Sequence, residues 1–206
     1  FILIEKKGFD YPNYYKKLYK MLIPASPSVS ENLFLMEDKA RFLRLLDLSL
    51  RSPKLPYKLV CSFLKRLAHL CVAFGFALAA EDCLFVVSFI ANLIIRHPKC
   101  KKLIQKSSSG DGKDPFLKEE EDPLETLAHR SSLWELQIIR KHHYDESVRN
   151  YCKIFKKDLL NKQSVFKCEK FTQSDPFESI QNDIAAIDLS KECHFLTQNL
   201  LQKHNQ

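Results

Sequence analysis

The sequence predicts an all-α fold, an α-solenoid or irregular HEAT-like helical stack that carries an acidic loop insert. Three observations lead to this prediction. Only 4 of the 206 residues are Gly, which leaves few positions for tight hairpin turns. Apolar residues recur at helical spacing over several long segments. The period-two alternation that is typical of strands does not persist over several segments.

The predicted helices cover residues 10–23, 31–51, 56–74, 80–97, 131–143, 145–160 and 191–204. Pro98 is expected to stop or kink the helix over 80–97, because proline lacks the N–H that continues a helix. That helix is apolar nearly all round, so we expect it at the centre of the core. Its Glu81 and Asp82 fit a helix N-terminus and would be costly at the centre of a bilayer. In the helix over 56–74, Lys65 and Arg66 are expected at polar positions.

We expect one helical domain over residues 1–206, and Phe1 in place of an initiator Met suggests part of a longer protein. Residues 107–125 are polar, contain two of the four glycines and lack a period, which predicts a flexible acidic insert. From residue 114 to 125 there are six acids and one Lys, a net charge of −5. This segment is either a solvated tether or a loop that docks on a basic partner. Residues 162–206 are expected to form a docking arm and a terminal helix.

The formal net charge is +7 and the pI is about 9.0, which indicates an acidic partner such as nucleic acid, an anionic membrane or an acidic protein. Residues 96–106 contain five bases and no acid, and residues 140–157 contain six Lys or Arg and two acids. Such runs suit phosphate contacts without base reading, although an ordinary solvated helix face has the same pattern. The candidate RNA-proximal residues are Arg96, Lys99, Lys101, Lys102, Arg140, Lys141, Arg149, Lys153, Lys156 and Lys157.

No catalytic residue, metal ligand or cofactor-binding residue is expected, and no cofactor is expected. The 7 Cys lack C-x-x-C spacing, which argues against a zinc ribbon and favours reduced thiols. His142 and His143 project about 100° apart on a helix, so they do not easily share a metal. A nucleophile pair of Cys152 and His143 is the one enzymatic alternative. Asp145 is interpreted as the N-cap of the following helix.

Trp134 lies among Leu133, Leu136, Ile138 and Ile139, which indicates a core helix. A stacking platform for a nucleic-acid base is the alternative for this residue. The chain's only Trp therefore marks either packing or base recognition.

Four blocks of sequence resemble the C-terminal region of the nucleolar complex protein 4 family, within the CCAAT-binding-factor-like nucleolar group. They are YPNYYKKLYKML at 11–22, KARFLRLLDLSLRSPKLPYKLVCSFLKRLAHL at 39–70, VVSFIANLIIRHPKC at 86–100, and residues 114–148, which contain SSLWEL. The last two blocks are the most specific. The residues that carry this signature, with structural roles, are Asn92, His97, Pro98, Ser132, Trp134 and Glu135.

The resemblance implies a non-catalytic scaffold in the nucleolus or nucleus, with a helical, repeat-like fold. Members of the family act in the small-subunit processome, support maturation of pre-18S particles, and pair with nucleolar protein 14. Pre-ribosomal RNA is expected nearby, with no membrane and no small-molecule substrate. Two alternatives remain, a general basic helical RNA-binding module and an enzyme that uses the His/Cys residues within 142–152.

Overall fold

The computed structural model describes residues 13–23, 39–75, 78–105 and 114–156. Contacts divide the chain into Phe1–Thr172 and Gln173–Gln206, and every described residue lies in the first unit. The predicted helix over 191–204, the docking arm over 162–206 and Lys157 lie outside the described residues. The single domain over 1–206 therefore stays a prediction. The described part is helical and contains no strand, which confirms the all-α class there.

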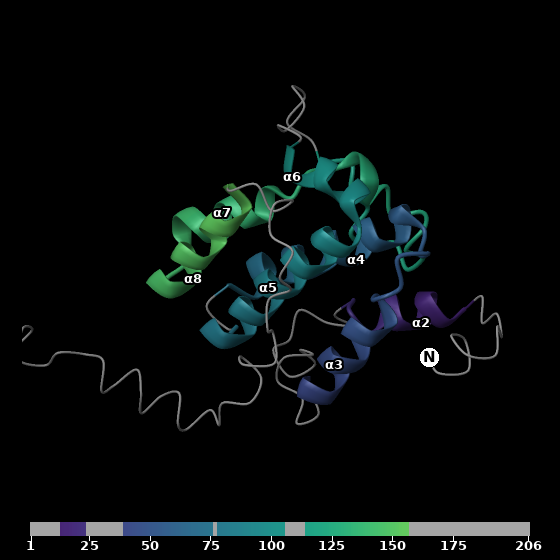
Figure 1. Cartoon of the computed structure of the whole chain (residues 1–206), viewed down its shortest axis with the longest axis horizontal. Helices are drawn as coiled ribbons and strands as arrows, with labels where there is room; N and C mark the ends of the chain where they lie inside the picture. The colour runs from purple at the N-terminus through teal and green to yellow at the C-terminus, as the bar shows by residue number, and fades with distance from the viewer. Residues whose placement is uncertain (1–12, 24–38, 76–77, 106–113, 157–206) are drawn as a thin grey trace, which may run out of the picture. The chain divides into compact units, whose positions relative to one another are not determined.

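Figure 1 shows the helices of the described part, in which a three-residue joint, 143–145, connects the last two α-helices, whereas residues 114–127 contain no helix. In chain order the elements are α2 (Tyr14–Lys20), α3 (Lys39–Ser49), α4 (Tyr57–Phe74), α5 (Ala80–Arg96), the 3-10 helix η4 (Pro98–Lys101), α6 (Lys102–Gln105), η5 (Ala128–Arg130), α7 (Trp134–His142), α8 (Glu146–Tyr151) and η6 (Cys152–Lys156).

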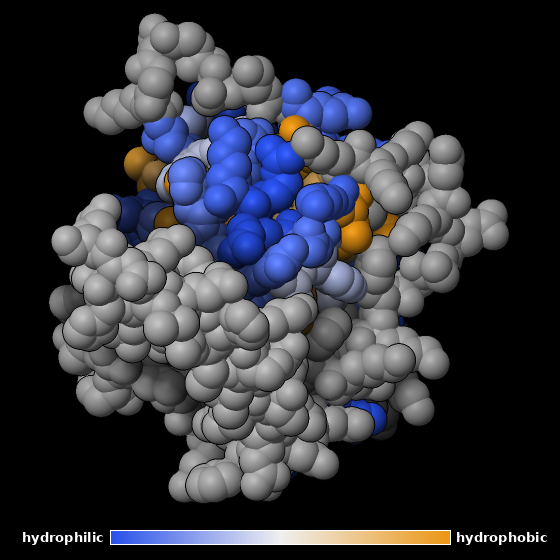
Figure 2. Space-filling model, turned by 90° about the vertical axis from the view of Figure 1, so that its left-hand side faces the viewer, coloured by the Kyte–Doolittle hydropathy of each residue, from blue (hydrophilic) through white to orange (hydrophobic). Residues whose placement is uncertain are grey.

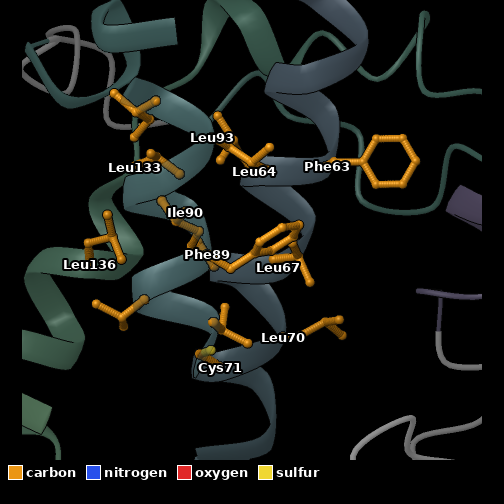
Figure 3. Close-up of a cluster of buried hydrophobic side chains, with 14 of the residues drawn as sticks. Phe63, Leu64, Leu67, Leu70, Cys71, Phe89, Ile90, Leu93, Leu133 and Leu136 are labelled. Atoms are coloured by element: carbon orange, nitrogen blue, oxygen red, sulfur yellow. The ribbon is translucent and has the colours of Figure 1, made fainter. Parts of the chain in front are cut away.

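The antiparallel pair α4 and α5 forms the centre of the core. In Figure 3, Phe89 of α5 lies against Leu67 of α4, and Leu133 and Leu136 approach α5 from the opposite side. Phe89 and Leu67 are both 0% exposed, so the sequence prediction that residues 80–97 lie at the centre is confirmed. Burying each such side chain contributes about 1.5–3 kcal/mol.

The helices α7 and α8 lie on one side of this pair, and α2 lies on the other (Figure 1). On the α2 side, the Tyr19 ring meets the Phe63 ring edge-on, with centroids 5.2 Å apart. On the α7 side, the amide of Leu133 donates to the carbonyl of Leu103 at 2.8 Å. The first contact joins α2 to α4, and the second joins the start of α7 to α6.

Local signals set the helix ends. The helix α4 ends at Gly75, whose φ of 47° and ψ of −117° favour a residue without a Cβ. Glu81 and Asp82 occupy the first turn of α5, and Asp82 pairs with Lys39 at 3.0 Å. The helix stops at Arg96, and Pro98 begins η4, as the sequence predicted. No helix among the described residues is long and apolar enough to cross a membrane.

The joint between α7 and α8 also agrees with the sequence. The Asp145 carboxylate accepts from the amide of Val148 at 3.0 Å, which confirms Asp145 as the N-cap of α8. The helix predicted over 145–160 is shorter than expected. It ends at Tyr151, and the chain continues as the tighter 3-10 helix η6. The basic residues after Tyr151 therefore do not extend the face of one regular α-helix.

Candidate functional site

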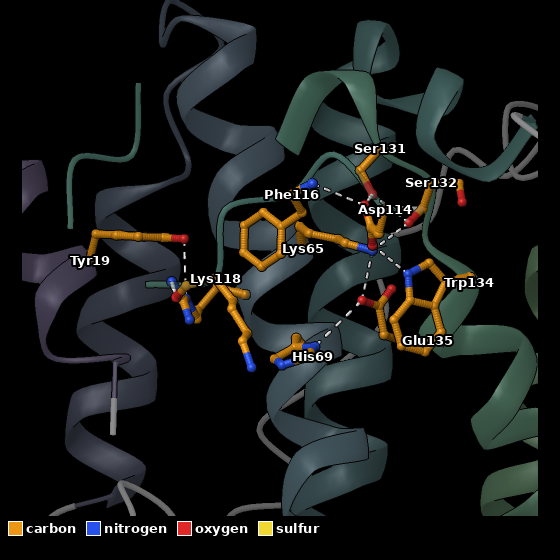
Figure 4. A network of polar contacts seen from close by, with 11 residues as sticks. Tyr19, Lys65, His69, Asp114, Phe116, Lys118, Ser131, Ser132, Trp134 and Glu135 are labelled. Atoms are coloured by element: carbon orange, nitrogen blue, oxygen red, sulfur yellow. Dashed lines mark hydrogen bonds and ion pairs between the residues drawn. The ribbon is translucent and has the colours of Figure 1, made fainter. Parts of the chain in front are cut away.

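A buried ion cluster, which we call the Lys65 cluster, joins α4, the loop before η5 and α7. It consists of Lys65, Asp114 and Glu135 (Figure 4). Lys65 Nζ lies 2.7 Å from Asp114 Oδ2 and 2.7 Å from Glu135 Oε1, and it donates to the carbonyl of Ser132 at 2.7 Å. The ammonium group therefore lies among three oxygens, one from each carboxylate and one from a carbonyl. The Lys65 and Glu135 side chains are both 0% exposed.

Trp134 completes this cluster rather than facing a ligand. The Lys65 ammonium lies 4.9 Å from the centre of the indole ring, a cation–π arrangement. The indole Nε1–H donates to Asp114 Oδ2. The interpretation of Trp134 as a packing residue fits this geometry better than a stacking platform, because the ring and its polar atom both serve the cluster.

The electrostatics of Asp114 follow from its partners. Burial by itself raises the pKa of Asp114, but hydrogen bonds from Lys65, Ser131, Trp134 and the amide of Phe116 outweigh burial and lower the pKa to about 2. Asp114 is therefore ionised at neutral pH and balances the Lys65 charge.

Glu135 is the second carboxylate of the Lys65 cluster, and it is less well satisfied. Its 2.7 Å contact with Lys65 is an ion pair by distance but is poorly directed for a hydrogen bond. Glu135 Oε2 is buried with no hydrogen-bond partner among the described residues. His69 Nδ1 lies 3.8 Å from Oε1, and its ring is partly exposed. Glu135 thus depends on Lys65 for most of its compensation.

The burial of Lys65 and Arg66 corrects the sequence interpretation, which placed both at polar helix positions. Lys65 is 0% exposed and Arg66 is 3% exposed. Arg66 Nε donates to the Tyr19 hydroxyl at 3.1 Å, and its Nη2 donates to the carbonyl of Lys118. In the structure 12 of the 18 residues of α4 are buried, so no continuous solvated face is left for the two cations.

The described part of the acidic segment, residues 114–125, contacts basic residues of the same chain. Glu121 pairs with Lys20 of α2 at 2.8 Å, and Asp122 lies 3.7 Å from Lys16. The carbonyl of Pro123 accepts from the Ser62 hydroxyl of α4. Both alternatives for this segment, the solvated tether and the loop that docks on a basic partner, stay predictions, because these contacts are with α2 and α4 of the same chain.

The signature residues occupy structural positions. Asn92 is buried in α5 at 2% exposure, and His97 Nε2 donates to the carbonyl of Leu50 at 3.1 Å. Pro98 begins η4, and Ser132, Trp134 and Glu135 form or contact the Lys65 cluster. In the described part these side chains are buried or lie in contacts between elements of the fold.

The candidate RNA-proximal residues divide into two groups. Arg96 pairs with Asp47 at 2.6 Å, and Arg149 donates to the carbonyls of His143 and Tyr144, so both cations are used within the fold. The others lie on η4, α6, α7 and η6. Four of these are exposed, Lys99, Lys102, Lys141 and Lys153, while Lys101 and Arg140 are half-buried, and the Lys156 side chain and Lys157 lie outside the described residues.

A pocket of about 260 Å³ lies between α6, α7 and η6. We call it the α6–α7 pocket. The residues that line the α6–α7 pocket are Ile104, Leu133, Leu136, Gln137, Arg140, Cys152 and Phe155. Figure 2 looks onto the α7–α8 side of the molecule, where hydrophilic side chains gather beside smaller hydrophobic areas.

A second, smaller pocket of about 100 Å³ is lined by residues of α4 and α7, including Cys71 and His143. Behind it, Cys83 hydrogen-bonds with both of these side chains, which lowers the pKa of Cys83 to about 6, although burial opposes the shift. Cys83 thus takes the place beside His143 that the enzymatic alternative gave to Cys152. Burial raises the pKa of Cys152 to about 12, so its thiol stays protonated at neutral pH. Cys83 is 0% exposed. Within the described residues, no three His, Cys, Asp or Glu side chains are grouped to hold a metal.

The sequence of the chain is similar to those of known proteins. The chain is 42% identical over 152 residues to nucleolar complex protein 4 homolog A of Xenopus laevis, which covers 72% of this chain and 26% of the relative. It is 42% identical over 149 residues to the Homo sapiens homolog, covering 71% of this chain and 26% of the relative. It is 41% identical over 150 residues to the Gallus gallus homolog, covering 71% and 27%.

The chain spans about a quarter of the length of these curated relatives, 26% to 27%. Residues 1–152 match the CBF/Mak21 family, and this range includes the four sequence blocks, the Lys65 cluster and nearly all of the α6–α7 pocket. With about three quarters of its residues matched, the chain belongs to the CBF/Mak21 family.

Proposed function

We propose that the chain acts as a non-catalytic assembly factor of the small-subunit processome, the 90S pre-ribosome. In this proposal it supports 18S rRNA maturation and small-subunit biogenesis by binding nucleolar protein 14. The observation that carries the proposal is the family match over residues 1–152, with relatives named for a nucleolar complex. These names also bear out the nucleolar localisation expected from the sequence.

The chain acts here by position rather than by chemistry. Its buried charged groups, Lys65, Arg66 and Glu135, serve helix packing, and Cys83 is enclosed. We propose that α4 and α5 form one helical pair of a HEAT-like stack and that α7 and α8 form the next. Such stacks bind partners along an extended surface. Pre-ribosomal RNA lies nearby, and exposed lysines such as Lys99 and Lys141 tolerate its phosphates.

The test is co-expression of the 206-residue chain with nucleolar protein 14, followed by size-exclusion chromatography and crosslinking. We expect a complex that is less sensitive to salt than RNA binding is, because ions screen charge contacts but not apolar ones. The alternative is a general RNA-binding module, whose affinity for naked RNA falls with salt at a log–log slope of roughly −0.7 per phosphate contact. Salt-sensitive RNA binding without a protein complex would contradict the proposal.

A further inference from the structure

The α6–α7 pocket combines an apolar floor with room for a side chain. Leu133 and Leu136 are 4% and 5% exposed, and Ile104 and Phe155 are half-buried at the same site. A volume of about 260 Å³ is well above that of a single water, whose share of liquid volume is about 30 Å³. Four apolar residues from three elements therefore form a cavity that can accept one large apolar side chain.

Nearly all charged side chains on the elements around this pocket are basic. Arg140 lines the pocket itself, and Lys102 and Lys153 are exposed neighbours of the lining residues. Only one carboxylate lies on η4, α6, α7 and η6, that of Glu135, which is 0% exposed and paired with Lys65. No carboxylate among the described residues neutralises the guanidinium of Arg140 or the ammonium of Lys102 by an ion pair. An occupant with negative charge around an apolar group complements this surface.

We propose that the α6–α7 pocket binds an acidic peptide segment of a protein partner, with one large apolar side chain of that segment inserted between Ile104, Leu136 and Phe155. The inference rests on the proposed function, since it names the kind of segment that a scaffold of this family would receive. The pocket supplies the anchor site, and the basic residues supply charge contacts at its edge.

The lining favours a peptide over RNA. Binding of single-stranded RNA depends on aromatic side chains on which successive bases stack. Phe155 is the single aromatic residue of the lining, and the rest of the floor is aliphatic or thiol. A leucine or phenylalanine side chain gains more from such a floor than a base does, because the base also carries polar edges that would be buried without partners.

The experiment uses the 206-residue chain and fluorescence anisotropy with three labelled probes. The first is a 14-residue peptide of Asp, Glu and Ser with one central Phe. The second has Ala in place of Phe, and the third is a 14-nucleotide oligouridine. We expect the Phe peptide to bind roughly 10- to 100-fold more tightly than the Ala peptide, which corresponds to burial of one aromatic side chain.

Two pairs of variants locate the binding. Arg140→Glu should weaken the Phe peptide about tenfold, whereas Lys17→Glu, the same charge reversal at an exposed position of α2, should change it less than about twofold. Gln137→Trp places a large ring at an exposed lining position and should abolish the difference between the two peptides. Ser147→Trp on α8 is its control. Circular dichroism checks that each variant is folded.

Equal binding of the Phe and Ala peptides, or no binding of either, would overturn the inference. Tighter binding of oligouridine that Arg140→Glu removes would also overturn it, with RNA as the occupant. The proposed function fails separately. Suppose that nucleolar protein 14 forms a complex that Arg140→Glu and Gln137→Trp leave unchanged, and that the chain binds the Phe and Ala peptides equally. Only the pocket inference is then wrong. If the chain binds the Phe peptide more tightly than the Ala peptide and no such complex forms, only the proposal of nucleolar protein 14 as the partner is wrong.

Discussion

Replacing Lys65 by Met tests whether the Lys65 cluster stabilises the fold. Methionine keeps most of the side-chain volume but removes the charge from a site where lysine is 0% exposed. Glu135 is then left 0% exposed with its nearest cation gone, and Asp114, at 26% exposure, keeps partial access to water. Removing one partner of a buried ion pair costs about 3–5 kcal/mol. We expect a loss in that range, and most of it arises from Glu135.

The assay is urea unfolding at pH 7, followed by circular dichroism in the far ultraviolet. The free energy of unfolding should fall by about 3–5 kcal/mol with an unchanged m-value. In a thermal scan this corresponds to a drop in Tm of roughly 6–20 °C for a chain of this size. The matched control is Lys17→Met, the same substitution at an exposed position of α2, which should stay within about 0.5 kcal/mol of the wild type.

A double variant separates the unpaired charge from lost packing. Combining Lys65→Met with Glu135→Leu removes the orphaned carboxylate and should recover most of the loss, because an apolar pair of similar size is often as stable as a buried ion pair. The coupling between the two sites should be at least about 1 kcal/mol. A cost below about 1 kcal/mol for Lys65→Met alone, or strictly additive effects, would refute the view that Lys65 compensates Glu135.

Two further predictions concern single carboxylates. The pKa of Asp114 is about 2 in the folded state, below the ordinary value of about 3.9. The ionised form of Asp114 therefore stabilises the fold fully above about pH 4, and this stabilisation is lost as the pH falls through about 2. Asp114→Asn should therefore flatten the acid limb of a plot of stability against pH, and an unchanged limb would contradict the assignment. Asp145→Ala should lower the free energy of unfolding in urea by about 1 kcal/mol through loss of the α8 N-cap. Asp145→Asn should retain most of the stability, because asparagine also caps helices. Equal losses for the two variants would show that the cap is not the cause.

Features that depend on neighbouring residues were predictable from the sequence. The centre of the core follows from the apolar run of α5, and its C-terminus follows from Pro98. The α7–α8 joint follows from Asp145. Each of these is decided within a few residues, because helix ends are set by backbone groups that only local side chains can satisfy.

Features that depend on distant partners were not predictable in the same way. Lys65 and Asp114 are 49 positions apart, and periodicity alone cannot pair them. The acidic segment was recognised by its charge, yet its contacts with Lys16 and Lys20 of α2 required the fold. The basic candidates were likewise found by counting charges. Tertiary contacts determine which of these residues serve helix packing, as Arg96 does, and which surround a pocket.

The helix α7 links the Lys65 cluster to the α6–α7 pocket. Trp134 and Glu135 project from it toward Lys65, while Leu136, Gln137 and Arg140 line the pocket. These residues lie within two helical turns, so a rotation of α7 about its axis would disturb both sites together. In some proteins a buried ion pair contributes more to a unique arrangement than to net stability. In this chain the Lys65 cluster is positioned to fix the orientation of α7, and with it the alignment of Arg140 over the apolar floor. On this reasoning, the Lys65→Met and Glu135→Leu double variant can recover stability and still bind the anchored peptide less well.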